Sequence, residues 1–218
     1  MQYQKMTSLR TRQKTDRTNR ILAAAAELFK SQDYEAVKME AIAALAEVSI
    51  GTIYNYYQNK GDLLLAIVTM EVDEVLVQGA GVVANPPLHV GDALDTLTGV
   101  YIDDVLISLN KEMWRLAMSI SILQPLSPLG VSYLAIDEAL MTQTCALVLR
   151  LQELGLVHAH VDAVGAGELI FNNANNMFIN YVKIESMALV ELRRMIRRQT
   201  RVMVDAISVK NLVVEIIK

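Results

Sequence analysis

Apolar residues recur three and four positions apart along most of the chain, and almost no segment alternates strictly between apolar and polar residues. Near the N-terminus this spacing joins Ile21, Leu22, Ala25, Leu28 and Phe29. Such steps match the α-helix, with about 3.6 residues per turn, whereas strict alternation is typical of a half-buried strand. The pattern therefore predicts an all-α protein.

Prolines and glycines divide this helical pattern into segments. The four prolines lie in the segments 86–87 and 125–128, and each segment is followed by a glycine. A third break, at 155–162, starts with a glycine and ends with an aspartate that can cap the next helix. The breaks predict helices over 17–30, 39–46, 49–57, 62–84, 91–109, 110–122, 131–154, 162–184 and 187–216.

The second and third of these helices are too short to be stable alone in water. Ile42 and Leu45 on one, and Ile53 and Tyr57 on the other, form apolar faces that can pack on the first helix. Two short helices joined by a tight turn and supported by a third form a helix-turn-helix, whose second helix enters the DNA major groove. The sequence over 17–64 thus predicts a DNA-binding domain.

The segment 49–60 carries chemistry that suits this role. Gly51 lacks a side chain where the start of the helix would approach a phosphate, and hydroxyl, amide and ammonium donors follow it. These donors are Thr52, Tyr54, Asn55, Tyr56 and Lys60. On chemistry alone, an ordinary capped helix with tyrosines on its surface explains them equally well.

A set of motifs between residues 17 and 65 adds to this interpretation. They are ILAAAAELF at 21–29, Tyr34, Ile42-Ala43, AEVS at 46–49, GTIY at 51–54, Tyr56-Tyr57, Lys60 and Leu63-Leu64. On these motifs the segment resembles the DNA-binding domain of tetracycline-repressor-like regulators, the TetR family. The resemblance implies a dimeric, all-α, ligand-responsive transcription regulator, usually a repressor.

The same resemblance assigns roles to single residues. Thr52 and Tyr54 match positions that touch bases or phosphates, and Lys60 matches the phosphate-binding lysine that follows the recognition helix. Asn55 and Tyr56 match more variable contact positions.

Three departures from the family pattern have physical consequences. Asp33 and Glu47 stand where the family usually has glycine, and a left-handed backbone at either residue would cost on the order of 1 kcal/mol. Val37-Lys38 replaces a Thr/Ser pair, so a hydroxyl cap is lost, although Lys38 can still reach a phosphate as a point charge.

Charge divides the chain in the same place as the motifs. Residues 1–60 carry nine Lys/Arg and six Asp/Glu, a net of +3, whereas residues 61–192 carry four and sixteen, a net of −12. Double-stranded DNA should therefore meet the N-terminal end. We expect a flexible basic arm over 1–16, the helix-turn-helix domain over 17–64, and a helical ligand-binding and dimerisation domain over 65–218.

The segment 169–182 is free of charge but holds five asparagines, and a solvated helix face normally carries Lys and Glu. We predict that Asn172, Asn176 and Asn180 lie in a homodimer seam; a polar wall of the effector pocket and an exposed polar face are the alternatives. The seam would also contain Leu189, Leu192, Ile196 and Met203, spaced by threes and fours or their sums. The five arginines between 193 and 201 lie opposite, as a solvated or acid-facing surface or, less simply, a second DNA patch.

For an unknown small-molecule effector the sequence offers only an inventory of aromatic and Met residues, which are usually core residues but can line an apolar pocket. The candidates are Tyr101, Trp114, Met118, Tyr133, Met141 and Phe178.

Other classes of protein are disfavoured. The single cysteine, Cys145, lies among apolar residues, where a thiol is inert, and no catalytic motif is apparent, so we expect neither an enzyme nor a cofactor. His158, His160 and Asp162 would ligate a metal only in an extended segment, so no metal site is expected. The lack of a disulfide, signal peptide or apolar span predicts a cytoplasmic protein without membrane passage. The alternative function is an all-α small-molecule-binding or interaction protein without operator affinity.

Overall fold

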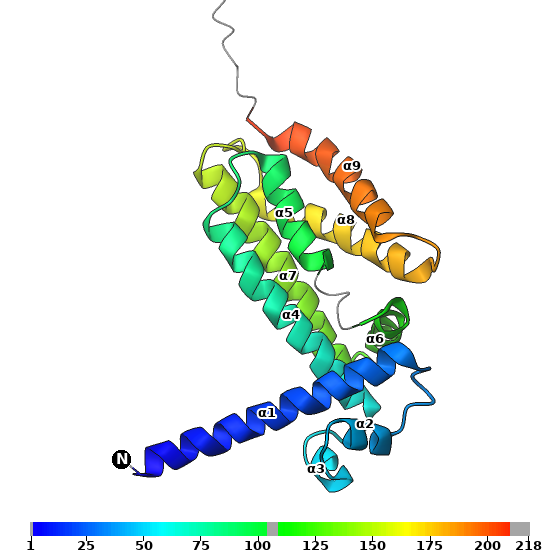
Figure 1. Cartoon of the computed structure of the whole chain (residues 1–218). Coiled ribbons are helices and arrows are strands. Elements are labelled where there is room, and N and C mark those ends of the chain that lie inside the picture. Colours follow the sequence, from blue (N-terminus) through cyan, green and yellow to red (C-terminus); the bar gives the residue numbers. More distant parts are fainter. Residues whose placement is uncertain (1, 104–108, 210–218) are drawn as a thin grey trace, which may run out of the picture. The chain divides into compact units, whose positions relative to one another are not determined.

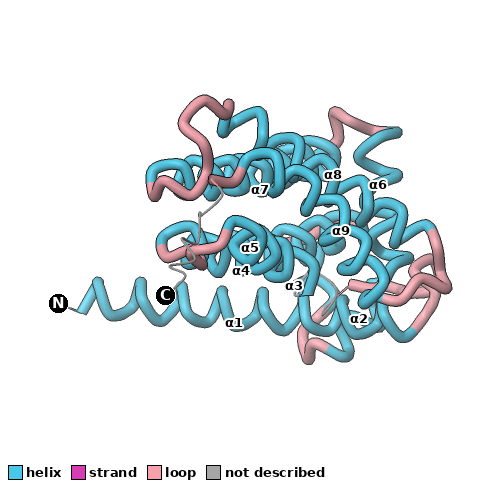
Figure 2. Tube along the Cα trace, turned by 90° about the horizontal axis from the view of Figure 1, so that it is seen from above, coloured by secondary structure: helices cyan, strands magenta, loops and turns pink. Residues whose placement is uncertain are grey.

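The computed structural model describes residues 2–103 and 109–209, and the described chain is built of helices joined by short loops (Figures 1 and 2). The helices are α1 Gln2–Ser31, α2 Met39–Leu45, α3 Ile50–Tyr54, α4 Lys60–Ala84, α5 Val90–Asp103, α6 Lys111–Leu123, α7 Pro128–Glu153, α8 Ala163–Lys183 and α9 Leu189–Ile207. Extended pairing within the described residues is limited to one isolated bridge between Val157 and Ser208. The predicted all-α class is confirmed.

Helix α1 begins at Gln2, so it runs through the stretch 2–16 that we expected to be an arm. The sequence contains neither glycine nor proline before Ser31, so nothing in it interrupts the helix. The helix ends at Ser31, whose hydroxyl donates to the carbonyl oxygen of Glu27 at 2.8 Å.

Helix α9 ends at Ile207, earlier than its apolar pattern predicts, because the chain there pairs with the connector between α7 and α8. The amide of Val209 donates to the carbonyl oxygen of Leu156, and the amide of His158 donates to that of Ile207. Residues 210–216 of the predicted helix lie outside the described residues, as do 104–108 of the predicted helix 91–109. Leu109 is not helical.

The chain packs into two compact units. The first comprises Met1–Asp73 and Val105–Ile136, and the second comprises Glu74–Asp104 and Asp137–Lys218. The first unit therefore contains the whole predicted helix-turn-helix domain together with α6.

In the first unit, α2 packs on both α1 and α3. Ile21 and Phe29 on α1, Ile42 on α2 and Ile53 on α3 are all buried, as their spacing predicted. Leu45, which we expected to be buried, is 43% exposed. It lies at the last position of α2, where the helix gives way to the turn.

The core of the second unit is formed by α5, α7, α8 and α9. It contains Val90, Ala93, Leu94, Leu97, Leu147, Val148, Leu151, Val157, Ala163, Ala166, Ile170 and Val204. Gly167 allows α8 to approach α7 closely, since a Cβ at this position would lie 2.5 Å from the Cα of Cys145. Among the described helices, none alone is long and apolar enough to cross a membrane.

Candidate nucleic-acid interface

The turn between α2 and α3 is set by one left-handed residue. Glu47 has a φ of 53°, the only positive value at a non-glycine residue in the described chain. Its carboxylate lies 3.9 Å from Arg20 but is 86% exposed, so that ion pair contributes little to stability. The strain expected at Glu47 is therefore present and is not offset by a strong contact.

Asp33, the other residue in place of a family glycine, forms its turn without a left-handed backbone. Its carboxylate accepts a hydrogen bond from the amide of Glu35 at 3.1 Å, an Asx-turn, and its φ is not positive. No strain follows from this substitution.

Helix α3 starts with a side-chain cap. Ser49 is extended, and its Oγ accepts from the amide of Thr52 at 3.1 Å and lies 2.8 Å from Thr52 Oγ1. The helix has only five residues, fewer than the predicted 49–57, and Ile53 is its only buried residue. A cap at one end and one apolar anchor hold this short helix in place.

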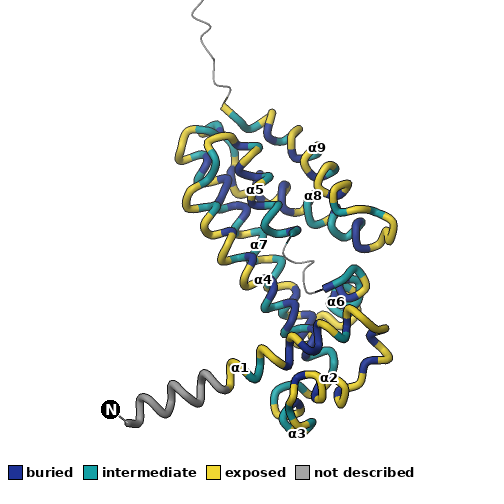
Figure 3. Tube along the Cα trace, in the orientation of Figure 1, coloured by how far each residue is buried: buried dark blue, intermediate teal, exposed yellow. Residues whose placement is uncertain are grey.

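The remaining face of α3 is open, as the colours of Figure 3 show. Tyr54 is 51% exposed, Gly51 and Asn55 are exposed, and Thr52 is half-buried. A Cβ on Gly51 would meet nothing closer than the Ser49 hydroxyl at 3.9 Å, so packing within the protein does not require glycine here. Close approach of another molecule is a reason for a glycine at this position.

Two further candidates flank α3. Tyr56 is half-buried, and the ammonium of Lys14 on α1 lies 6.0 Å from the centre of its ring. Sequence reasoning missed this contact between Lys14 and Tyr56, because it treated 1–16 as an arm. Lys38 is exposed at the start of α2 and makes no side-chain cap, as its replacement of a hydroxyl residue predicted.

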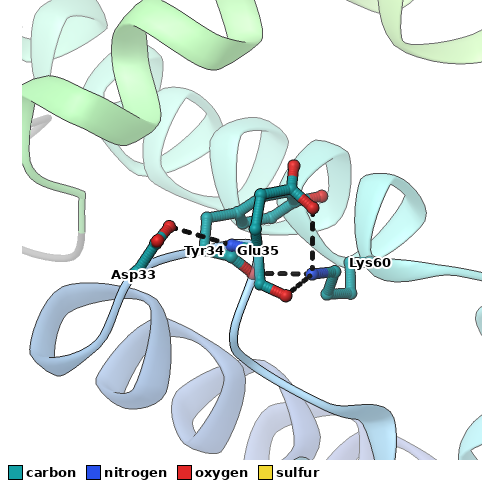
Figure 4. A network of polar contacts seen from close by, with 4 residues as sticks. All are labelled: Asp33, Tyr34, Glu35 and Lys60. Carbon is teal, nitrogen blue, oxygen red and sulfur yellow. Dashed lines mark hydrogen bonds and ion pairs between the residues drawn. The ribbon is translucent and has the colours of Figure 1, made fainter.

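Lys60, the first residue of α4, faces the loop between α1 and α2 (Figure 4). Its ammonium donates to the carbonyl oxygens of Tyr34 at 2.6 Å and Glu35 at 3.1 Å, and lies 3.8 Å from the Glu35 carboxylate. It also lies 4.5 Å from the centre of the Tyr34 ring. These internal contacts differ from the phosphate contact that the resemblance implied.

The six residues expected to line an effector pocket divide equally between the units. Tyr101, Met141 and Phe178 lie in the second unit, and Trp114, Met118 and Tyr133 lie in the first. Trp114 and Tyr133 are buried. The Tyr101 hydroxyl donates to Gln143 Oε1 at 2.9 Å, and burial raises its pKa.

Two cavities of the second unit are lined by other residues. One, of about 610 Å³, lies between the start of α5, the α7–α8 connector and the end of α9; another, of about 410 Å³, lies between α4, α5 and α9. None of the six candidates lines either cavity, so their role in a pocket stays a prediction. Asp137 on α7 is a polar group that sequence reasoning missed: burial raises its pKa to about 6, against a hydrogen bond with Asn175 that lowers it.

The structure corrects part of the predicted dimer seam. Leu192 and Ile196 are buried inside the protomer, where α9 packs on α8 and α5. Spacing by threes and fours shows that a face is buried but not against which partner. Asn172 and Asn176 are exposed, whereas Asn180, Leu189 and Met203 are half-buried.

The arginines of α9 form an acid-facing surface, as predicted. Arg197 pairs with Asp95 of α5 at 2.6 Å, and Arg193 pairs with Asp103 of the same helix. The connector histidines, His158 and His160, stack with their ring centres 5.2 Å apart. In the described part of the chain no three His, Cys, Asp or Glu side chains gather into a possible metal site.

Comparisons with known proteins agree with this geometry. Residues 21–67 match the model of the family described as bacterial regulatory proteins, tetR family. A segment of 72 residues is 38% identical to the HTH-type transcriptional repressor KstR of Rhodococcus jostii strain RHA1, covering 33% of this chain and 32% of that protein. The chain thus matches about a third of the length of such relatives.

Solved structures extend the likeness to the whole fold. A TetR transcription regulator from Haloarcula marismortui superposes with a TM-score of 0.73 at 16% identity, over 89% of this chain and 100% of that chain. FadR of Thermus thermophilus, a repressor solved in complex with lauroyl-CoA, gives 0.61 at 20% identity, over 88% and 96%. Residues 21–67 therefore match the tetR-family model, and the chain has the same fold as these solved regulators.

Proposed function

We propose that the protein is a ligand-responsive, sequence-specific DNA-binding regulator of transcription, and that it acts as a repressor released from a palindromic operator by a small-molecule inducer. The observation that carries this proposal is α3 itself, a capped helix anchored by a single buried residue and otherwise open, within the segment that matches the tetR family. Two copies of α3 would enter successive major grooves, about 34–36 Å apart.

The contacts follow from exposure. Tyr54 and Asn55 are exposed beside the open backbone at Gly51 and provide a hydroxyl and an amide for base edges or phosphates. Lys14 on α1 and Lys38 at the start of α2 provide exposed ammonium groups in the same domain. Lysines at the edge of such a surface add affinity that depends on salt but not on sequence.

Footprinting on the DNA upstream of the coding region tests the proposal, followed by titration of the protected duplex at several salt concentrations. We expect protection of a palindrome and a linear fall of log affinity with log salt. Lys14→Met should lower the slope by about 0.9 per protomer. Thr52→Ala should instead relax the preference for the palindrome over a scrambled duplex.

Val77→Ala is the matched control, because Val77 is 75% exposed on α4. Binding that ignores salt, or no binding to any duplex, would favour a small-molecule-binding or interaction protein without operator affinity.

For the inducer we propose a small molecule held by the helical domain, and for the assembly a homodimer through the exposed face of α8. FadR of Thermus thermophilus, which shares the fold, was solved with lauroyl-CoA, so a long-chain acyl-CoA is a first compound to add to the footprint. An inducer acts only as far as it prefers the non-binding geometry, typically by about 1–3 kcal/mol.

A further inference from the structure

The ammonium of Lys60 points toward acceptors within the protein. It donates to two backbone carbonyl oxygens, of Tyr34 and Glu35, and faces the Glu35 carboxylate, while its side chain keeps only 21% of its exposure. Two of the three ammonium donors are used by these carbonyl oxygens, and the Glu35 carboxylate at 3.8 Å adds an ion pair. A phosphate would have to compete with these internal contacts for the ammonium.

The position of Lys60 in its helix also argues for an internal role. It is the first residue of α4, where the helix dipole disfavours a cation. The helix start is already capped without it: Asn59 accepts from the amide of Asp62, whose carboxylate accepts from the amide of Gln58. Carbonyl oxygens and a carboxylate around the ammonium offset the unfavourable dipole.

The loop that Lys60 holds determines where α2 begins. The Tyr34 ring is buried against Phe29 of α1, with ring centres 5.0 Å apart, and the Lys60 ammonium lies 4.5 Å from its centre. Helix α2 starts after Lys38 without a side-chain cap, so no side-chain hydrogen bond from the N-cap position fixes its first turn. The anchored loop supplies that restraint.

We propose that Lys60 is a positioning residue: it ties the α1–α2 loop to the first turn of α4 and thereby fixes the placement of α2 and α3 for DNA. This proposal rests on the proposed function. It replaces the phosphate contact that the family resemblance assigned to Lys60, and it makes Lys60 act on DNA only through the backbone that it holds.

The two roles differ in their salt dependence. A phosphate contact releases counterions, so its loss lowers the slope of log affinity against log salt by about 0.9 per protomer. Loss of a positioning residue leaves the slope of log affinity against log salt unchanged, but it misplaces α3 and so lowers affinity. We expect Lys60→Met to weaken operator binding about tenfold with an unchanged slope, as when only about a tenth of the molecules keep α3 in the binding position.

Lys14→Met is the matched variant, since it removes an ammonium that lies exposed beside Tyr56. It should lower the slope of log affinity against log salt, so its loss of affinity should be smaller at high salt than at low salt. Both variants are measured at a temperature where circular dichroism shows them fully folded, so that lost stability alone cannot lower affinity. A slope reduced in Lys60→Met as in Lys14→Met, or an affinity equal to wild type, would overturn the proposal.

A measurement on the wild type covers the case in which Lys60→Met does not fold. Nitrogen-15 spectra of the lysine side chains should show the Lys60 ammonium exchanging slowly with water, because its protons are held by carbonyl oxygens, and unshifted when operator DNA is added. Rapid exchange in the free protein, or a shift on adding DNA, would refute the proposal. If the wild type binds no duplex, the proposed function fails, while slow exchange still shows the tie to the loop.

Discussion

Helix α3 buries one residue of its five, Ile53, whereas α9 buries a stripe that includes Leu192 and Ile196. The motif around α3 fixed both the fold of that region and the direction in which its polar residues face. The spacing along α9 also predicted a buried stripe, but assigned it to a second copy of the chain. A sequence motif can indicate what a helix face packs against, whereas the spacing of apolar residues indicates only that the helix has a buried face.

Leu192→Ala gives the largest effect that separates these two regions. Leu192 is fully buried in the protomer, so we expect a loss of about 3 to 5 kcal/mol of unfolding free energy in urea. The loss should not depend on protein concentration. Asn176→Lys, on the exposed face of α8, is the counterpart: it should give monomers in sedimentation, and its unfolding should equal that of wild type when both are measured at concentrations where they are monomeric. If Leu192→Ala were monomeric and unfolded like wild type, Leu192 would belong to the dimer interface instead of the protomer core.

Ile53→Ala removes the single anchor of α3. Since the side chain is fully buried near the surface of a small domain, we expect unfolding to cost about 2 to 4 kcal/mol less and operator binding to be lost. The neighbouring Tyr54→Ala should change stability by less than about 0.5 kcal/mol, because Tyr54 is half exposed, while still weakening binding. Equal destabilisation by both variants would mean that α3 is not held through Ile53.

Gly167→Ala tests the close contact of α7 and α8. The new methyl group would lie 2.5 Å from the Cα of Cys145, so we expect a loss of about 1 to 3 kcal/mol in thermal unfolding. Gly99 on α5 has open space around it, and Gly99→Ala should stabilise by about 0.5 to 1 kcal/mol through helix propensity. A higher melting temperature for Gly167→Ala than for Gly99→Ala would contradict the close contact between α7 and α8.

Asp137→Asn tests the raised pKa of a half-buried carboxyl. Burial raises the folded-state pKa from 3.8 to about 6, so the folded protein prefers the protonated form, and the stability present below the unfolded pKa is lost as pH rises through about 6. At pH 7 the amide variant should be more stable by on the order of 1 kcal/mol. The unfolding free energy of wild type in urea should differ between pH 4.5 and pH 7, and this difference should be smaller in the variant. Glu138→Gln, at an exposed neighbour, should leave it unchanged.

Glu47→Gly gives the smallest expected change. Relief of the left-handed backbone at φ 53°, less the entropy of glycine, should stabilise the first unit by about 0.5 kcal/mol. Asp33→Gly serves as the comparison, since Asp33 holds an Asx-turn, and it should be neutral or destabilising in the same urea titration. A gain at Asp33 alone would reverse this account of the two departures from the family pattern.

Sequence reasoning placed the helices well and their ends less well. Glycine, proline and capping residues marked where α5, α7 and α8 begin, because those signals are local. The end of α9 was missed, since Ser208 leaves the helix to pair with Val157, a contact between distant segments. The internal contacts of Lys60 were missed for a related reason: its partners are carbonyl oxygens 25 and 26 residues away, and no side-chain pattern reveals a backbone acceptor.

The contact between Gly167 and Cys145 has a practical consequence. Cys145 is the only cysteine in the chain, and its thiol is buried where the two helices touch, with a pKa raised by that burial. A disulfide-exchange reagent such as Ellman's can therefore modify the protein at one atom, and we expect the reaction to be faster when α7 and α8 move apart. The rate of that colour reaction therefore reports local opening of the second unit without an attached label. Candidate effectors can be ranked by how far they slow the reaction.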